Sequence, residues 1–260
     1  MLIEMENVSL KREDKLIVRN INWKVDAGQH WAILGMNGAG KTTLLNLVCG
    51  YLYPTTGTIK VLDKPFGRYP LNELRKEIGW VSSSFSEKMR HHFHNNGLEI
   101  ILSGKFASIG LHEQPTAADI DKAKEIMSQL GIKKLQNQPY EIMSQGEKLR
   151  ILIGRALMAT PRLLILDEPC AGLDFLSKEQ LLTTVEQLAK QQETTILYVS
   201  HQIDEILPIF THTLLLREGE IFSQGLTGEQ LTSKKLSDFC HTPVQVNRVN
   251  QRYSLEIQTD

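Results

Sequence analysis

Cysteine is scarce in this chain, and it does not occur in the close pairs that bind zinc or exchange disulfides. Its three cysteines, Cys49, Cys170 and Cys240, are widely spaced and odd in number. This spacing argues against a disulfide framework and against a C-x-x-C zinc or redox site. We expect reduced thiols in a cytosolic protein.

Long apolar runs and a basic excess are also missing. No apolar segment approaches the roughly 20 residues of a membrane-spanning helix, and the N-terminus lacks a secretory signal pattern. The formal net charge is −1, whereas proteins that wrap nucleic acid usually carry a basic excess. We therefore expect a cytoplasmic protein that needs a separate membrane protein for any work at the inner face of a membrane. The charge disfavours nucleic acid as a partner, although a local basic face stays open.

Strand-like and helix-like segments alternate along the chain. Apolar runs with strand character recur at residues 3–10, 16–25, 30–34, 58–62, 78–82, 163–166 and 195–199. Between several of them the apolar residues follow a helical spacing, as at 123–130 and 149–156. This alternation predicts an α/β fold with a mainly parallel sheet flanked by helices. The first two runs, on either side of a charged turn, predict an N-terminal antiparallel β portion.

The order of the segments predicts one large domain at 1–225 followed by a tail. A helix-rich stretch at 83–149 separates two α/β stretches and predicts an inserted helical subdomain. The turn Glu218-Gly219 between two apolar runs predicts a hairpin. Residues 226–260 predict a short helix and, from alternating apolar residues at 244–253, a candidate β-hairpin.

Residues 35–42 fit the phosphate-binding pattern G-x-x-x-x-G-K-T between a predicted strand and a predicted helix. Its glycines let backbone N–H groups point at phosphate oxygens, helped by the helix N-terminus. Lys41 is expected to reach the β- and γ-phosphates, and the Thr42 hydroxyl to ligate Mg²⁺. The alternative, a glycine-rich turn with an accidental lysine, fits the flanking elements poorly. The expected nucleotide-binding residues here are Gly35, Asn37, Gly38, Ala39, Gly40, Lys41, Thr42 and Thr43.

The apolar strand at 163–166 ends in two carboxylates, Asp167 and Glu168. Asp167 is expected to hold Mg²⁺, directly or through water. Glu168 is expected to polarise the attacking water as general base, an effect typically worth about 10²–10⁴-fold in rate. Carboxylates often end strands as solvated residues, so this pattern depends on the phosphate loop for its meaning.

Three further motifs are in register with these two. The run Met143-Ser144-Gln145-Gly146-Glu147-Lys148 resembles the signature of the ABC ATPase family, with Met143, Gln145 and Glu147 in place of the usual Leu, Gly and Gln. Downstream, Ala171–Asp174 resembles the family's D-loop, and Ser200-His201 stands where its switch histidine is expected. On these motifs, across roughly residues 1–225, the chain is identified as a member of the ABC ATPase family.

This resemblance implies an ATPase in which two copies sandwich two ATP molecules with Mg²⁺. Lys41, Glu168 and His201 are then the catalytic residues, with His201 contacting the γ-phosphate. Each site is completed by the other copy, through Ser144, Gln145, Gly146 and Asp174. Simpler roles stay open for three of these residues. Ser144 and Glu147 form an S-x-x-E capping box, Asp174 can cap the next helix, and His201 can be an ordinary strand-end histidine.

Two positions depart from the family pattern. Where most members have a glutamine that touches Mg²⁺ or water and senses the membrane partner, this chain has Ser83. A serine could reach metal only through water, or it could simply end a strand. The adenine-stacking aromatic is replaced by Arg12, which could stack its guanidinium on adenine or could equally be a solvated turn residue.

The serine run at 82–84, the segment 101–104 and the signature variant resemble the branch labelled molybdenum-transport or photorepair components.

His91, His92 and His94 lie in a polar loop without cysteine or carboxylate at metal spacing, so a solvated loop is favoured over a metal site, and contact with a partner stays open.

We expect the ATP-binding subunit of a membrane transporter, with an integral membrane permease as partner. The alternative is a soluble ATPase switch in repair, translation or regulation. A non-catalytic nucleotide-binding module is disfavoured by the intact set Lys41, Asp167, Glu168 and His201.

Overall fold

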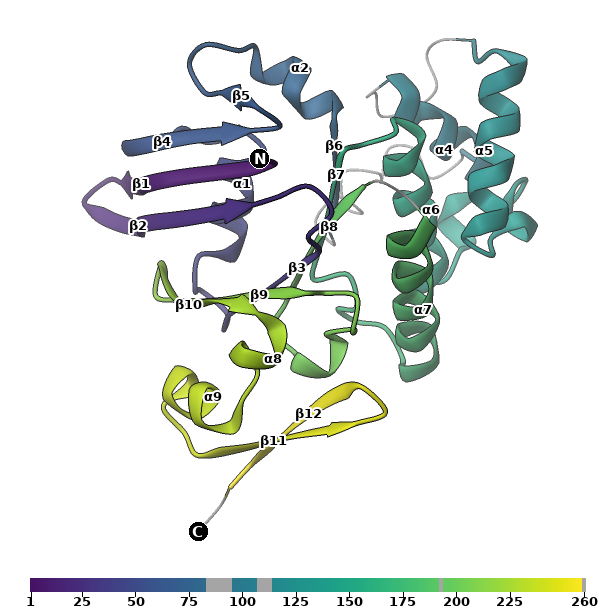
Figure 1. The fold of residues 1–260 in the computed structure, drawn as a ribbon. Helices are drawn as coiled ribbons and strands as arrows, with labels where there is room; N and C mark the ends of the chain where they lie inside the picture. Colours follow the sequence, from purple (N-terminus) through teal and green to yellow (C-terminus); the bar gives the residue numbers. More distant parts are fainter. Residues whose placement is uncertain (83–94, 107–113, 192–193, 259–260) are drawn as a thin grey trace. The chain divides into compact units, whose positions relative to one another are not determined.

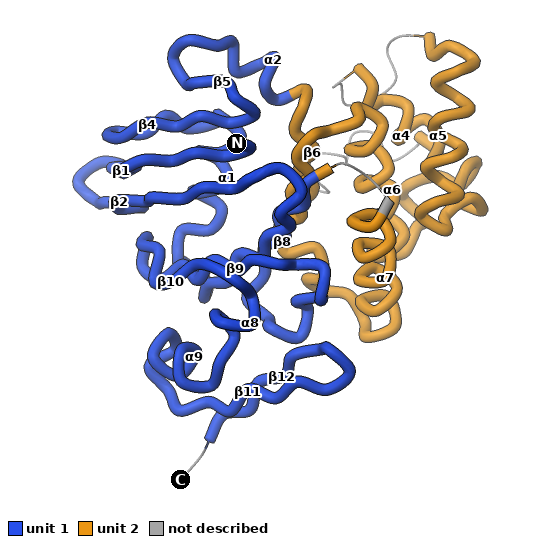
Figure 2. The backbone as a smooth tube through the Cα atoms, viewed as in Figure 1, with its two compact units in different colours: residues 1–75, 195–260 blue, residues 76–194 orange. Residues whose placement is uncertain are grey.

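The computed structural model describes residues 1–82, 95–106, 114–191 and 194–258. They divide into two compact units, shown in different colours in Figure 2. Unit 1 comprises residues 1–75 and 195–260, and unit 2 comprises residues 76–194.

Unit 1 begins with an antiparallel sheet whose order is β2-β1-β4-β5. Its strands are β1 (Ile3–Arg12), β2 (Lys15–Val25), β4 (Thr56–Val61) and β5 (Lys64–Pro65) (Figure 1). Alternate residues of β1 and β2, among them Ile3, Met5 and Ile21, are buried, as expected for a sheet with one covered face. The antiparallel β portion expected from the sequence is thus present. Both strands extend into the charged turn, which tightens to two residues.

A second set of strands in unit 1 is mainly parallel. It contains β3 (Trp31–Leu34), β8 (Thr195–Ser200), β9 (His212–Arg217) and β10 (Glu220–Leu226). Strand β3 runs parallel to both β8 and β9. Strands β9 and β10 form the hairpin predicted at Glu218-Gly219, where both turn residues have positive φ. All residues of β3 and β8 are buried, as is typical of strands covered on both faces.

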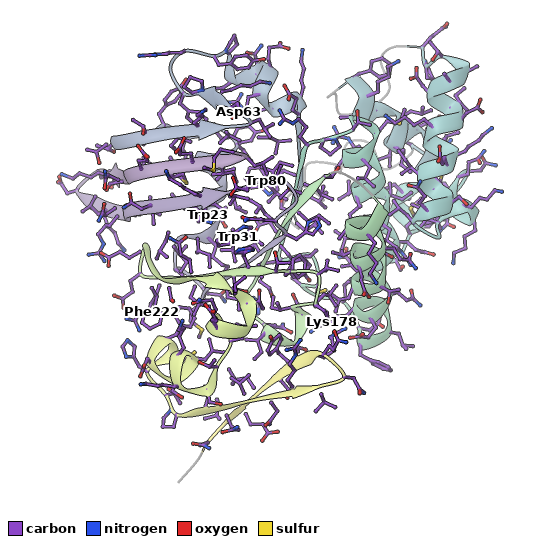
Figure 3. The ribbon with its side chains drawn as sticks, viewed as in Figure 1. Trp23, Trp31, Asp63, Trp80, Lys178 and Phe222 are labelled. Carbon is purple, nitrogen blue, oxygen red and sulfur yellow. The ribbon has the colours of Figure 1, made fainter. Side chains whose placement is uncertain are left out.

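Two tryptophans join the two sheets of unit 1. Trp23 of β2 meets Trp31 of β3 edge to face, with ring centroids 5.7 Å apart (Figure 3). Trp31 also stacks on His212 of β9, with a centroid distance of 4.9 Å. These aromatic contacts belong to the buried centre of the unit.

The remaining elements of unit 1 are short. They are α1 (Lys41–Val48), α2 (Leu71–Lys76), the 3₁₀ turn η5 (Ile203–Glu205), α8 (Thr227–Gln230), α9 (Ser233–Cys240), β11 (Val244–Val249) and β12 (Arg252–Ile257). Strands β11 and β12 are antiparallel partners with Val244 opposite Ile257. Their two turn residues, Asn250 and Gln251, both have positive φ.

Unit 2 is mostly helical. Its strands β6 (Ile78–Ser82) and β7 (Leu163–Asp167) are parallel partners. Its helices are α4 (Gly97–Ser103), α5 (Ala117–Gln129), α6 (Gln145–Met158) and α7 (Phe175–Gln191), with 3₁₀ turns η2 (Gly104–Phe106), η3 (Lys133–Leu135) and η4 (Tyr140–Ile142).

The helices of unit 2 pack as the apolar spacing predicts. Ala123, Ile126 and Met127 of α5 are buried, as are Leu149 and Ile153 of α6. Gly104 passes so close to the Arg155 backbone that a Cβ there would overlap the Arg155 carbonyl oxygen. Among the residues that the structure describes, no helix has the length and apolar character needed to cross a bilayer.

Candidate functional site

The phosphate-loop pattern folds around the side chain of Lys41. Lys41 is the first residue of α1 and only 6% exposed, and its Nζ donates to the carbonyl oxygens of Gly35 at 2.8 Å and Met36 at 3.3 Å. The loop therefore wraps the ammonium group within its own backbone. This arrangement places a buried positive charge beside the N-terminus of a helix, where anions bind favourably.

The glycines of the loop give this backbone its shape. Gly38 and Gly40 have φ of 81° and 101°, angles that residues with a Cβ rarely adopt. Gly40 is the N-cap of α1, and no described side chain makes a capping hydrogen bond there. The first-turn N–H groups of α1 are thus not capped by a side chain, and these are the groups that a phosphate needs.

The β9–β10 turn is hydrogen-bonded to the backbone of the phosphate loop. Gly219 donates its N–H to the Ala39 carbonyl at 2.9 Å and accepts from the Arg19 N–H at 2.8 Å. Gly219 has φ of 81°, and a Cβ there would collide with the Ile17 carbonyl oxygen. The Glu218-Gly219 pattern predicts this hairpin but not its contact with Ala39, because a local pattern carries no information about a partner so far along the chain.

The other predicted residues of the loop differ in exposure, and Gly35 and Ala39 are buried. Asn37 and Thr42 are exposed and Thr43 is half-buried. Asn46 donates a hydrogen bond to the Thr42 carbonyl at 2.7 Å, which holds the backbone of the first turn of α1.

His201 emerges beside the phosphate loop. Strands β3 and β8 are parallel neighbours with Leu34 opposite Ser200, so Gly35 and His201 both follow the carboxyl ends of adjacent strands. In open parallel sheets this is the edge at which ligands bind. Gly35, Met36 and His201 line the same pocket of about 270 Å³. The His201 side chain is exposed, which agrees with a ligand contact better than with a buried structural histidine.

In unit 2, the two carboxylates predicted at the end of β7 have different surroundings. Asp167 is 8% exposed and pairs in register with Ser82 of β6. Glu168 is half-buried and has φ of 49°, a left-handed angle that costs a non-glycine residue about 1–2 kcal/mol. Its carbonyl accepts a 3.2 Å hydrogen bond from the Ala171 N–H. Strained backbone of this kind clusters at functional sites, and no local sequence pattern indicates it.

The signature run begins α6. Ser144 is the N-cap, and its Oγ accepts from the Glu147 N–H at 3.3 Å while Glu147 accepts from the Ser144 N–H at 3.0 Å. The predicted capping box is therefore confirmed. Partial burial acts to raise the pKa of Glu147, but hydrogen bonds from Ser144 and Lys134 outweigh it, so the net pKa is lowered. Ser144 and Gln145 are exposed.

Asp174 caps α7, as the sequence allowed. Its carboxylate accepts from the Ser177 N–H at 2.9 Å and from the Ser177 hydroxyl at 2.7 Å. These bonds, the backbone one first, lower the pKa of Asp174. The same Ser177 faces Gly146, where a Cβ would lie 3.3 Å from the Ser177 Cβ. The structure thus brings the signature run and the D-loop-like segment together in unit 2.

Two predicted residues remain unassigned. Arg12 is exposed at the end of β1, opposite Lys15 in the strand register, a place that agrees with either role proposed for it. Ser83 and the histidines 91, 92 and 94 lie outside the described residues. Within the described part of the chain, no group of three or more His, Cys, Asp or Glu side chains is arranged to hold a metal ion.

Comparison with known proteins gives consistent results. A sequence model described as ABC transporter matches residues 18–171. The uncharacterized ABC transporter ATP-binding protein YlmA of Bacillus subtilis (strain 168) is 47% identical over 248 residues, covering 95% of this chain and 93% of YlmA. The ABC transporter ATP-binding protein ModF of Escherichia coli (strain K12) is 34% identical over 86% of this chain and 46% of its own length.

Among solved structures, cbiO1 from Clostridium perfringens, part of the ABC transporter complex cbiONQ, is 26% identical with a TM-score of 0.78. The match covers 91% of this chain and 93% of cbiO1. The predicted family, its distant relation to the molybdenum branch and the predicted fold class are confirmed by these similarities.

Proposed function

We propose that this chain, which belongs to the ABC transporter family as one of its ATP-binding proteins, hydrolyses ATP with Mg²⁺ in a dimer of two copies. The observation that supports this most is the arrangement of unit 1. There a buried lysine, uncapped helix N–H groups and an exposed histidine meet at the carboxyl ends of adjacent parallel strands.

The phosphates of ATP bind at residues 35–43 in this proposal. The first-turn N–H groups of α1 and the Lys41 ammonium supply the positive potential. On ATP binding, the Lys41 Nζ exchanges contacts with the Gly35 and Met36 carbonyls for phosphate oxygens, a small movement within its loop. His201 contacts the γ-phosphate from the neighbouring strand. Arg12 is the candidate for the adenine contact.

The donor groups present fit Mg²⁺, which prefers a few oxygen ligands together with substrate phosphates. Thr42, which is exposed, offers a hydroxyl, and Asp167 offers a carboxylate at the end of β7, with Ser83 as a third candidate. When bound, Mg²⁺ would neutralise charge on the β- and γ-phosphates. Glu168 accepts a proton from the attacking water.

The second copy enters through unit 2. The exposed Ser144 and Gln145, with Gly146 and Asp174 beside them, complete the nucleotide site of the other copy. Apolar side chains are exposed around them: Ile142 is 66%, Phe175 76% and Leu176 59% exposed. Large exposed apolar side chains next to polar recognition groups are typical of protein interfaces.

A separate integral membrane permease is the proposed second partner, which places the chain at the inner face of a membrane. In this arrangement residues 1–225 form the nucleotide-binding domain, residues 83–149 its helical subdomain, and residues 226–260 an accessory tail. ATP binding closes the dimer and hydrolysis reopens it, so that the chemistry drives motion in the permease.

The substitution Glu168→Gln tests this function. We expect ATP hydrolysis to fall by about 100-fold or more, while ATP with Mg²⁺ produces a stable dimer in size-exclusion chromatography with light scattering. Glu125→Gln, at an exposed position on α5, is the matched control and should behave as wild type. A Glu168→Gln protein that stays monomeric with ATP, or that hydrolyses ATP at the wild-type rate, would contradict the proposal.

The trapped dimer also tests the permease. Affinity purification of the Glu168→Gln protein from its native cells should recover an integral membrane protein. Recovery of ribosomes, of DNA or of the chain alone would contradict the transporter arrangement.

A further inference from the structure

The turn that carries His201 is held from inside by a buried carboxylate. Glu205, in η5, is 3% exposed, and its Oε2 accepts hydrogen bonds from Ser200 Oγ at 2.7 Å and Tyr198 Oη at 3.0 Å. Ser200 Oγ in turn accepts from the Gln202 N–H at 3.0 Å. The Oγ of Ser200 therefore links the two neighbours of His201. It belongs to the residue before His201 and is hydrogen-bonded to the backbone of Gln202, the residue after it.

The same turn is held from outside by the C-terminal hairpin. Strand β12 packs against η5, and Arg252 donates from Nη2 to the carbonyl of Asp204 at 3.0 Å. Leu255 of β12 and Ile203 of η5 line the 270 Å³ pocket that also contains Met36 and His201. Figure 1 shows β11 and β12 as one long hairpin at the C-terminal end of unit 1.

We infer that two supports position His201 for its contact with the γ-phosphate. Ser200 and Glu205 form the inner support, and Arg252 forms the outer one. The supporting groups are positioning residues, because they act through the backbone on either side of His201. The inference rests on the role proposed for His201. It gives the C-terminal hairpin, which none of the nucleotide-binding motifs includes, a function in catalysis.

The need for such support follows from the exposure of the turn. His201 and Gln202 are both exposed, and they lie between the end of β8 and the start of η5. Core packing therefore does not fix their backbone. A catalytic group displaced by about 1 Å can lose on the order of 100-fold in rate, so hydrogen bonds that hold this backbone have a direct effect on turnover.

The test compares the two supports with a control on the same hairpin. Ser200→Ala removes the oxygen that serves Glu205 and Gln202, and Arg252→Ala removes the outer bond. The free energy lost with one hydrogen bond corresponds to a factor of about 3 to 10 in a rate or an equilibrium constant. We expect kcat for ATP hydrolysis to fall about tenfold in Ser200→Ala and about threefold in Arg252→Ala, with the KM for ATP within about twofold of wild type. Arg252→Lys, which keeps a cationic donor, should recover most of the loss.

Arg248→Ala is the matched control. Arg248 is exposed on β11, and its guanidinium lies over the Tyr253 ring at 5.3 Å without a bond to the turn. It should keep the wild-type kcat. In protein labelled with ¹³C at the histidine ring, the His201 resonance, assigned with His201→Gln, should shift in Ser200→Ala and Arg252→Ala and stay in place in Arg248→Ala.

The outcomes separate this inference from the proposed function. If His201→Gln hydrolyses ATP at the wild-type rate, the role proposed for His201 is wrong. If His201→Gln is impaired but Ser200→Ala and Arg252→Ala match Arg248→Ala in kcat and in the His201 resonance, only the positioning inference is wrong. A loss of kcat in Arg252→Ala matched by an equal loss in Arg248→Ala would also overturn it, since it would reflect general loosening of the hairpin.

Discussion

The phosphate loop of unit 1 (residues 35–42) and the signature run of unit 2 (residues 143–148, here called the signature loop) both lead into a helix. They differ in the burial of the side chains at the start of that helix. Lys41, at the start of α1, is 6% exposed and hydrogen-bonded to its own loop. Ser144 and Gln145, at the start of α6, are exposed. The first loop buries its charged side chain, whereas the second exposes its polar side chains.

The two helix N-termini are also capped differently. Glycine caps α1 without a side-chain hydrogen bond, so a phosphate can take the N–H groups of its first turn. Ser144 and Glu147 cap α6 reciprocally. We therefore expect the first loop to bind ATP without help, and the second to act only on a nucleotide already held by another copy. Three predictions, which use four substitutions, sharpen this contrast.

The largest effect is expected from Lys41→Ala. The charge-assisted hydrogen bonds proposed between Lys41 and the phosphates would each be worth about 1.5–3 kcal/mol, so ATP affinity should fall by about 100-fold. Isothermal titration calorimetry with ATP and Mg²⁺ measures this, and circular dichroism checks that the variant is folded. Unchanged ATP affinity in a folded Lys41→Ala protein would mean that the loop is not the nucleotide site.

A smaller effect is expected when alanine replaces the glycine of each loop. At Gly40, with φ of 101°, the new Cβ would also lie 3.3 Å from Val18 Cγ1, and the strained backbone should cost about 1–3 kcal/mol. At Gly146 the backbone needs no positive φ, and the better helix propensity of alanine offsets a 3.3 Å contact with Ser177. Differential scanning calorimetry should show a clear loss for Gly40→Ala and little change for Gly146→Ala. Equal losses would remove the contrast between the loops.

The smallest effect concerns Asp174, beside the signature loop. Its pKa is lowered by the Ser177 hydrogen bonds, so its contribution to stability is present above the ordinary carboxyl value of 3.8 and is lost as the pH falls through the lowered native value. The melting temperatures of wild type and Asp174→Ala should therefore differ most near neutral pH and converge in acid. A difference that stays constant with pH would show that the carboxylate does not cap α7 as described.

Much of this fold follows from local sequence. The apolar runs of β3, β7 and β8 are short and continuous, and the apolar spacing in α5 and α6 is helical, so these elements are predictable. The capping roles of Ser144 and Asp174 are predictable for the same reason, because a cap depends only on residues two or three positions away.

What the sequence did not reveal depends on long-range contacts. The support of Ala39 by Gly219, the left-handed backbone of Glu168 and the bond from Arg252 to Asp204 are set by how distant segments pack. Strand β5, with 2 residues, and helix α2, with 6 residues, were also not predicted, because such short segments are too short for a periodic pattern. The motif residues near 35, 167 and 201 stand out in the sequence because their residue types and order match a known pattern, which does not depend on how distant segments pack.

Mixing two inactive variants tests the central claim most directly. Lys41→Ala disables the phosphate loop, and Ser144→Arg blocks the signature run. Ser128→Arg on α5 is the control for an added arginine at an exposed serine. If each site combines the phosphate loop of one copy with the signature loop of the other, a mixed dimer contains one intact site and one doubly disabled site. We expect each variant alone to be inactive, Ser144→Arg to keep the ATP affinity of the monomer, and the mixture to regain ATP hydrolysis. A mixture as inactive as its components, when mass spectrometry shows that mixed dimers have formed, would contradict the shared site.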